Sequence, residues 1–181
     1  MKWIAIVLGV VAVLVLIVVL IGASLPKSHV AVRSAAVHKP AAEVWNAVTD
    51  VSSAAGWRTD IESTEMLSAS NGRIAWREIG KNGAVSYEGE MVRAPKPGVP
   101  GRFISRITDK SLPYGGEWII DVVVAGDGSV VTVTENGEVY NPLFRFVSRY
   151  IMGYTATIDG YLRALGHHFG ENVTPVESAP I

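Results

Sequence analysis

The sequence contains no cysteine. Disulfide bonds, thiolate metal sites and a cysteine nucleophile are therefore excluded together. The same absence leaves the redox compartment undetermined, because a chain without cysteine fits either side of a bacterial membrane. We expect no cofactor and no bound metal, since the remaining candidate ligands show no metal-binding spacing.

The sequence also lacks an excess of charge of either sign. Lys and Arg together number 16 and Asp and Glu number 17, which gives a formal net charge of -1 at pH 7. No block of like charges occurs along the chain, so it lacks the basic stripe that binding to a phosphate backbone requires. Nucleic acid is therefore excluded as a partner.

One long apolar run stands near the N-terminus. All 19 residues from Trp3 to Ile21 are apolar or glycine. At a rise of about 1.5 Å per residue they match a hydrocarbon core of roughly 30 Å. Lys2 and Lys27 bracket the run, as charged residues bracket many membrane spans. We therefore predict that residues 1–24 form one transmembrane anchor, with this run in contact with lipid.

Two properties of the anchor stay open. A cleaved signal peptide would also begin with a basic residue such as Lys2 and end at small residues such as Gly22-Ala23-Ser24, although its apolar part is usually only about 7 to 15 residues long. The flanking charges give no consistent orientation, because Lys2 favours an inside N-terminus whereas Lys27 and Arg33 favour the reverse. We expect a single-pass protein of the bacterial inner membrane, with the side of its soluble domain undecided.

The rest of the chain is long enough for one domain with its own hydrophobic core. We assign residues 25–28 to a linker, residues 29–170 to the domain and residues 171–181 to a flexible tail. A strand-like stretch from Val30 to Val37 opens the domain. Pro40 then begins a helix, which a second short helical piece follows.

From Ile61 to Val139 the sequence predicts an antiparallel meander. Turn residues separate its extended segments at Asn71-Gly72, Asn82-Gly83, Pro95 to Gly101, Gly115-Gly116 and Asp127-Gly128. The clearest strands cover residues 73–79, 85–92, 102–108, 117–124 and 130–135. Alternation places one set of apolar side chains on a single face of the sheet, namely Ile74, Trp76, Val85, Tyr87, Met91, Phe103, Ile107, Trp118, Ile120 and Val122.

The last long element is predicted to be one continuous helix from Asn141 to Gly166. Asn141 is a good N-cap, and Pro142 suits the first helical position. The apolar stripe of this helix consists of Leu143, Val147, Tyr150, Ile151, Tyr154, Ile158, Tyr161, Leu162 and Leu165. Gly153 and Gly160 share one flank of the helix, where close packing is expected. The stripe should cover the sheet.

This order of elements resembles the helix-grip fold of the START-like superfamily, which includes polyketide cyclases and lipid-transfer proteins. The local signature is the segment from Lys39 to Trp45, Lys-Pro-Ala-Ala-Glu-Val-Trp, followed by Asp50 and Trp57. Segments 112–118 and 135–142 look like features of a membrane-anchored, polyketide-cyclase-like branch. The resemblance implies an α+β fold in which a curved antiparallel sheet wraps a long C-terminal helix, preceded here by one transmembrane helix.

In that superfamily the space between the sheet and the long helix commonly holds a lipid or another hydrophobic small molecule. The resemblance therefore implies such a partner for this chain. The side chains that would line the cavity are Trp76, Tyr87, Trp118, Tyr150 and Tyr154. Core packing is the alternative explanation for each of them, because aromatic residues fill cores more often than they contact ligands.

The sequence shows no recognisable combination of catalytic residues. The histidines are His29, His38, His167 and His168. None of them has the spacing of a metal pair or of a base beside a nucleophile. Glu135 and Glu138 could act as an acid or base beside a cavity, but ion pairs with Arg145 or Arg149 are the favoured explanation. We assign no catalytic residue, and the sequence favours a protein that is not an enzyme.

Three functions stay open at this point. The first is membrane-anchored binding of a hydrophobic small molecule or lipid. The second is an enzyme of the polyketide-cyclase or dehydratase type, in which a cavity carboxylate and a tyrosine would move a proton. The third is an interaction domain whose core is closed by packing. A cavity of at least about 300 Å³ between sheet and long helix would separate the first two from the third.

Overall fold

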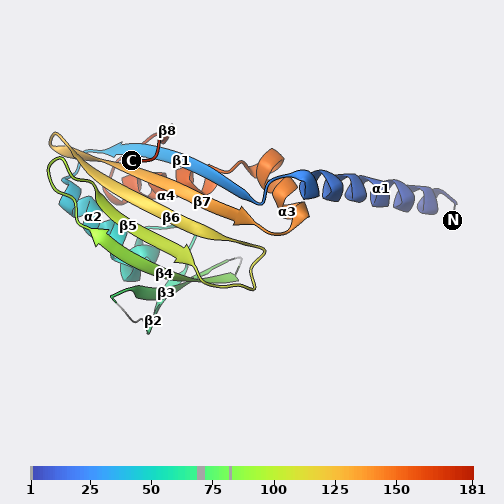
Figure 1. Cartoon of the computed structure of the whole chain (residues 1–181), viewed down its shortest axis with the longest axis horizontal. Coiled ribbons are helices and arrows are strands. Elements are labelled where there is room, and N and C mark those ends of the chain that lie inside the picture. The colour runs from blue at the N-terminus through green and yellow to red at the C-terminus, as the bar shows by residue number, and fades with distance from the viewer. Residues whose placement is uncertain (1, 69–71, 82) are drawn as a thin grey trace.

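The computed structural model describes every residue except residues 1, 69–71 and 82 (Figure 1). Asn71 and Asn82, both expected in turns, lie outside the described residues. The helices are α1 Lys2–Ser24, α2 Ala41–Thr49, the 3-10 helix η1 Val51–Gly56, α3 Pro142–Val147, the π-helical turn η2 Ser148–Met152 and α4 Ala156–His168. The strands are β1 Ser28–Val37, β2 Ser63–Leu67, β3 Ile74–Gly80, β4 Gly83–Arg93, β5 Gly101–Ile107, β6 Tyr114–Ala125, β7 Gly128–Val139 and β8 Val176–Glu177.

The strands form an eight-stranded sheet in the order β2-β3-β4-β5-β6-β7-β1-β8. Strands β2 to β7 follow one another as the predicted antiparallel meander, whereas β1 pairs with β7 at the far side of it. The sheet is curved, and α2 and α4 lie on its concave face (Figure 1). The predicted α+β architecture, with helices on one face of a curved antiparallel sheet, is confirmed.

The hydrophobic core lies between the concave face and the helices α2 and α4. On α4, Ile158, Leu162 and Leu165 recur at the spacing of one helix face, and all three are buried. The buried side chains beneath them on the sheet are Phe103, Ile120, Val122, Val131 and Val133. Met91, which alternation places on the same face, is exposed, and the register of β4 shifts directly after it.

Two boundaries within the meander differ from the prediction. Gly115 and Gly116 do not separate strands but lie inside β6, opposite Glu138 and Gly137 of β7. Strand β2 lies inside the predicted meander but is not among its clearest predicted strands, because its sequence is mostly polar. The turn predicted at Asp127-Gly128 is confirmed, since β6 ends at Ala125 and β7 begins at Gly128.

The prediction of one continuous C-terminal helix is wrong. Asn141 does cap the first part, since its side-chain oxygen accepts a hydrogen bond from Leu143 N at 2.9 Å. After the π-helical turn, however, Gly153 adopts φ +76° and ψ 154°, a conformation open essentially to glycine alone, and the helix ends there. The chain then turns and restarts as α4 at Ala156. Only Tyr154 and the α4 part of the predicted stripe cover the sheet.

The flexible tail predicted for residues 171–181 also differs from what the structure shows. The Glu171 carboxylate accepts hydrogen bonds from the backbone N of His38 at 3.0 Å, and Val173 packs against the core. Val176 and Glu177 then pair with β1 as the short strand β8. This pairing covers the edge of the sheet at Arg33 and Ser34, so it gives the last residues a structural role.

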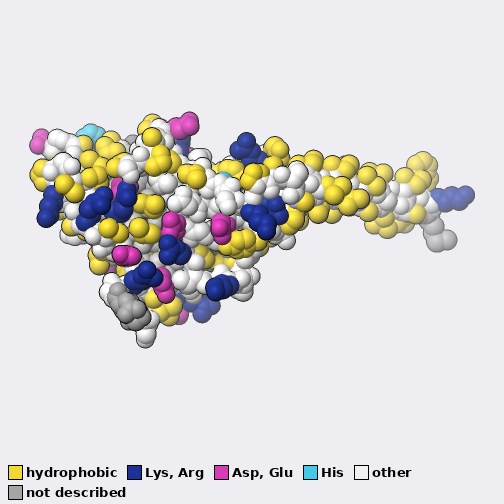
Figure 2. Space-filling view, viewed as in Figure 1, with side chains coloured by type: hydrophobic (Ala, Val, Ile, Leu, Met, Phe, Trp, Pro, Cys, Tyr) yellow, Lys and Arg dark blue, Asp and Glu magenta, His cyan; other side chains and the backbone are white. Residues whose placement is uncertain are grey.

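Helix α1 projects from one end of the domain (Figure 1). Among the described residues it is the helix long and apolar enough to cross a membrane, and its apolar window is not buried in the domain. Hydrophobic side chains cover its length, whereas the domain surface shows mixed charges (Figure 2). A helix with this surface suits the hydrocarbon core of a membrane, and a signal sequence has the same apolar character. Such a surface is unfavourable in water.

Candidate functional site

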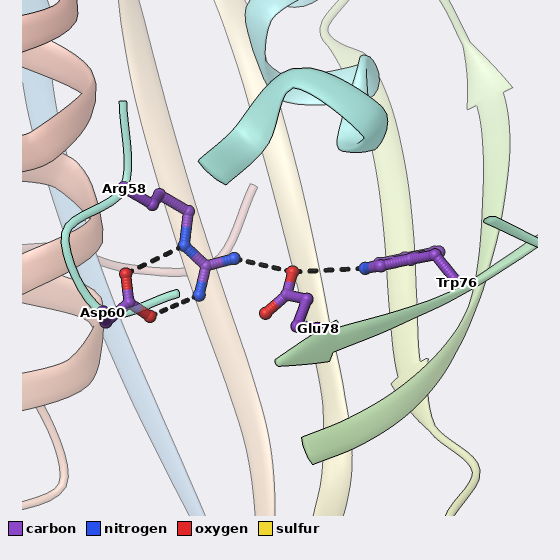
Figure 3. Close-up of polar contacts among 4 residues, drawn as sticks. All are labelled: Arg58, Asp60, Trp76 and Glu78. Atoms are coloured by element: carbon purple, nitrogen blue, oxygen red, sulfur yellow. Dashed lines mark hydrogen bonds and ion pairs between the residues drawn. The ribbon is translucent and has the colours of Figure 1, made fainter. Parts of the chain in front are cut away.

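The first polar cluster on the concave face is centred on Glu78 of β3 (Figure 3). Its Oε1 atom accepts hydrogen bonds from Arg58 Nη1 at 2.8 Å and from Trp76 Nε1 at 3.1 Å. Trp76 and Glu78 are two residues apart on one strand, so both side chains point to the same face. Arg58 follows η1 and also donates from Nε to Asp60 Oδ1 at 3.1 Å.

Burial and charge together determine the protonation of this cluster. Burial opposes the charge of Arg58, yet the hydrogen bond to Asp60 and the charges of Glu78 and Asp60 raise its pKa above the ordinary value. Burial also raises the pKa of Tyr87 and Tyr161, and the charge of Glu78 adds to the rise. Both phenols therefore stay protonated at neutral pH and can donate hydrogen bonds, but cannot serve as bases.

Asp60 should give the protein a measurable sensitivity to acid. Burial alone would raise the pKa of its carboxyl, but the hydrogen bond and charge of Arg58 lower it below the ordinary value of 3.8. A lowered folded-state pKa contributes stability that is complete above the ordinary value and is lost as pH falls through the lowered one. We expect Asp60→Asn to reduce the loss of stability on acidification.

The measurement for Asp60 is denaturant unfolding of the full chain between about pH 6 and about pH 2, where carboxylates titrate. The control is Asp127→Asn, on the exposed turn between β6 and β7, which should keep the acid sensitivity of the wild type. An identical pH dependence for Asp60→Asn and the wild type would contradict the assignment.

The second polar cluster is centred on Glu135 of β7. Its carboxylate contacts His29 Nε2 at 3.0 Å and accepts a hydrogen bond from Trp118 Nε1 at 2.7 Å. The His29 ring stacks on Tyr154, with ring centroids 3.8 Å apart. Gly137 lies opposite His29 on β7, and a Cβ atom at this position would overlap the His29 ring. The glycine is therefore what lets the imidazole lie across the strand.

Tyr161 of α4 lies between the two clusters. Its ring meets that of Trp118 at a centroid distance of 5.4 Å and that of Trp57 at 5.5 Å, both edge to face. The Arg58 guanidinium lies 5.8 Å from its centroid. Within the described part of the chain, Trp57 Nε1 and Thr64 Oγ1 are buried without a hydrogen-bond partner. The concave face thus combines an aromatic wall with a few polar atoms.

The five residues predicted to line a cavity differ in how deeply the structure buries them. Trp76 is buried, and Tyr87, Trp118 and Tyr154 are half-buried around the two clusters. Tyr150 is 59% exposed on η2, so its placement in the cavity is wrong. The reason is the break at Gly153, which turns η2 away from the sheet. Contact of the other four with a ligand stays a prediction.

The ion pairs predicted for Glu135 and Glu138 are wrong. Glu135 binds His29 and Trp118, and Glu138 accepts a hydrogen bond from the Tyr140 hydroxyl at 2.7 Å. Arg145 instead donates to backbone oxygens at the end of α1.

Among the hollows on the described part of the domain surface, two are open and similar in volume. One, of about 370 Å³, lies between α2, η1 and the end of α4 and includes Glu43, Asp50 and His168. The other, of about 400 Å³, lies beside the end of β1 and residues 171–174. Neither lies between the concave face and α4, where side chains such as Tyr161 and Leu162 occupy the space. A molecule bound there would have to displace side chains.

Comparison with known families identifies the class of protein. Residues 28–165 match the family described as polyketide cyclase / dehydrase and lipid transport. The chain belongs to this family, and the predicted membership of the START-like superfamily is confirmed. The match begins at the first residue of β1 and ends within α4, so it excludes α1. A comparison with curated protein sequences finds no match.

Solved structures show the same fold. Norcoclaurine synthase from Thalictrum flavum superposes with a TM-score of 0.60 at 13% identity, covering 84% of this chain and 91% of that one. A STAR-related lipid transfer protein from Xanthomonas axonopodis gives 0.53 at 16% identity, covering 82% and 96%. A START superfamily protein from Mycobacterium smegmatis gives 0.57 at 13% identity, covering 77% and 96%. These likenesses confirm the helix-grip fold.

Proposed function

We propose that this protein is a membrane-tethered binding protein for a hydrophobic small molecule or lipid, held on the concave face of the sheet. The observation that carries the proposal is the composition of that face. An aromatic wall of Trp76, Tyr87, Trp118 and Tyr161 surrounds a few fixed polar groups. Ligand sites for apolar molecules are typically built in this way, with most of the wall apolar and a few polar atoms to orient the ligand.

The polar atoms favour a ligand with one polar end. Trp57 Nε1 is a buried donor without a partner in the described residues, and it lies next to Arg58 in the chain. A buried donor of this kind usually meets water or a ligand acceptor, because leaving it unpaired costs about 1–3 kcal/mol. A carbonyl, hydroxyl or phosphate oxygen would suit it. The apolar body of the ligand would then lie along Tyr87 and Trp118.

Helix α4 and its side chains would have to yield to such a ligand. Tyr161 occupies the centre of the face, between Trp57 and Trp118. Its edge-to-face contacts are worth about 0.5–1.5 kcal/mol each beyond their buried area, an amount that a bound lipid chain can replace. In this proposal α4 shifts without moving α3, because the helix is interrupted at Gly153. The family's association with lipid transport and the lipid transfer neighbour support this assignment.

Helix α1 would act as the tether. It spans 23 residues, long enough for a hydrocarbon core of roughly 30 Å. A carrier held beside a bilayer meets its ligand at a high local concentration, which compensates for weak binding. If α1 were instead a cleaved signal peptide, the mature protein in cells would lack it, and the mass of the protein from membranes would show this.

The test is native mass spectrometry, combined with lipid extraction, on the full chain purified from membranes in detergent. We expect a bound small molecule in stoichiometric amount, lost in Trp118→Ala. The matched control is Trp3→Ala, at the far end of α1, because lipid that merely coats α1 would not distinguish the two variants. If the wild type shows only the mass of the protein without a ligand, the binding proposal is wrong, and an interaction domain with a closed core is favoured.

A further inference from the structure

Residues 143–152, which we call the juxtamembrane segment, expose an unusual amount of apolar surface. Its exposed hydrophobic side chains range from 44% to 71% exposed and are Leu143, Phe144, Tyr150, Ile151 and Met152. They are neighbours on one short stretch of α3 and η2, not isolated positions. Contiguous apolar surface of this kind on a folded protein typically marks a contact with another phase or molecule.

The juxtamembrane segment is fixed against the end of α1. Helices α1 and α3 pack on one another, and a Cβ atom at Gly22 would overlap the carbonyl oxygen of Pro142. The buried guanidinium of Arg145 donates to Leu25 O at 2.8 Å and to Ala23 O at 3.4 Å. These oxygens lie at the C-terminal end of α1, where a cation is favourable. The segment therefore lies level with the last turn of α1.

Basic side chains surround the same junction. Lys27 follows α1 after Leu25 and Pro26, and Arg149 lies within η2. Lys and Arg side chains are visible on both sides of the junction between α1 and the domain (Figure 2). A flat apolar segment flanked by Lys and Arg is the composition of a helix that lies in a membrane interface, with its apolar side in the acyl boundary and its cations among anionic headgroups.

We propose that the juxtamembrane segment lies in the interfacial layer of the bilayer that α1 crosses and is covered there by lipid. This inference rests on the proposed membrane tether and adds a second point of contact to it. Two contacts fix the orientation of the domain, whereas α1 alone would leave it free to tilt. Tyr154 lies shortly after the segment, and it stacks on His29 near the start of β1. The Glu135 end of the concave face would therefore lie next to lipid.

The absence of cysteine makes a direct test possible. Single variants Ile151→Cys, Val10→Cys and Asp127→Cys are labelled with an environment-sensitive fluorophore and reconstituted as full chains. The vesicles contain phosphatidylethanolamine and phosphatidylglycerol, with nitroxide spin labels at defined depths. Val10 lies in the middle of α1, and Asp127 lies on the exposed turn at the opposite end of the sheet. All three positions are exposed in the structure, so none of the substitutions disturbs the core.

We expect the Ile151 probe to shift its emission to shorter wavelength and to be quenched most by nitroxides near the headgroups. The Val10 probe should be quenched most by nitroxides deep in the bilayer, and the Asp127 probe by neither. If the Val10 probe is quenched by the deep nitroxides but the Ile151 probe is not quenched, this inference is wrong and the proposed tether stands. An Ile151 probe that is shifted but not quenched would mean that protein covers the segment, which also overturns it. An unquenched Val10 probe would overturn the tether and, with it, this inference.

Discussion

Replacing Arg58 with methionine is expected to destabilise the folded protein by about 3–5 kcal/mol, the usual cost of breaking a buried ion pair. Glu78 is only 7% exposed, and Arg58 supplies the positive charge that compensates its carboxylate. Without the guanidinium, Glu78 keeps the hydrogen bond from Trp76 as its one side-chain partner among the described residues. The measurement is denaturant unfolding of the full chain in detergent micelles, followed by tryptophan fluorescence.

Two variants make the Arg58 result specific. Arg73→Met removes a cation of the same type from an exposed pair with Glu88, and it should cost no more than about 1 kcal/mol. The double variant Arg58→Met with Glu78→Gln removes both buried charges and should recover much of the stability that the single variant loses. Equal losses for Arg58→Met and Arg73→Met would show that the pair at Glu78 is not buried in solution.

Only some residues of the two polar clusters could be predicted from the sequence. The inward direction of Trp76, Tyr87 and Trp118 follows from alternation alone. The same alternation also turns Glu78 inward, two residues after Trp76. A charged residue at an inward position is the sequence signal that could have indicated this polar cluster. Arg58 carries no such signal, because a loop residue has no periodicity that would assign it to a face.

The pairing of His29 with Glu135 depends on long-range topology. The two residues are 106 positions apart, and they meet only because β1 pairs with β7 across the sheet. The order of elements resembles a known fold, and this resemblance places β1 near the last strand. Register, however, decides which side chains face one another, and a shift by one residue would turn every side chain to the other face. Sequence patterns do not determine that register for strands so distant in the chain.

The helix break illustrates a different limit. Gly153 and Gly160 lie seven residues apart and look alike in the sequence, yet Gly160 remains inside α4 whereas Gly153 takes a positive φ. Glycine permits both conformations at little cost. Packing decides between them: α1 and Arg145 hold α3 at the end of the domain, while the sheet holds α4. The first of these contacts involves the apolar anchor, and no sequence pattern predicts that the anchor packs on a distant helix.

The interruption of the helix at Gly153 can be tested by comparing Ile158→Ala with Ile151→Ala. On one continuous helix these residues, seven positions apart, would share a face and be buried equally. In the structure Ile158 is fully buried whereas Ile151 is 71% exposed. We expect Ile158→Ala to cost about 2–5 kcal/mol, the range for truncating a buried isoleucine. Ile151→Ala in detergent micelles should stay within about 0.5 kcal/mol of the wild type.

The comparison between the two isoleucines also separates folding from membrane contact. Both variants remove the same atoms, so a difference in unfolding free energy reports burial within the protein and not side-chain chemistry. Similar large losses would mean that both parts of the stripe pack on the sheet, as an unbroken helix requires. A loss confined to Ile158 means that the fold does not need the side chain of Ile151. Its apolar surface is then available for lipid, which is the property that the juxtamembrane segment needs.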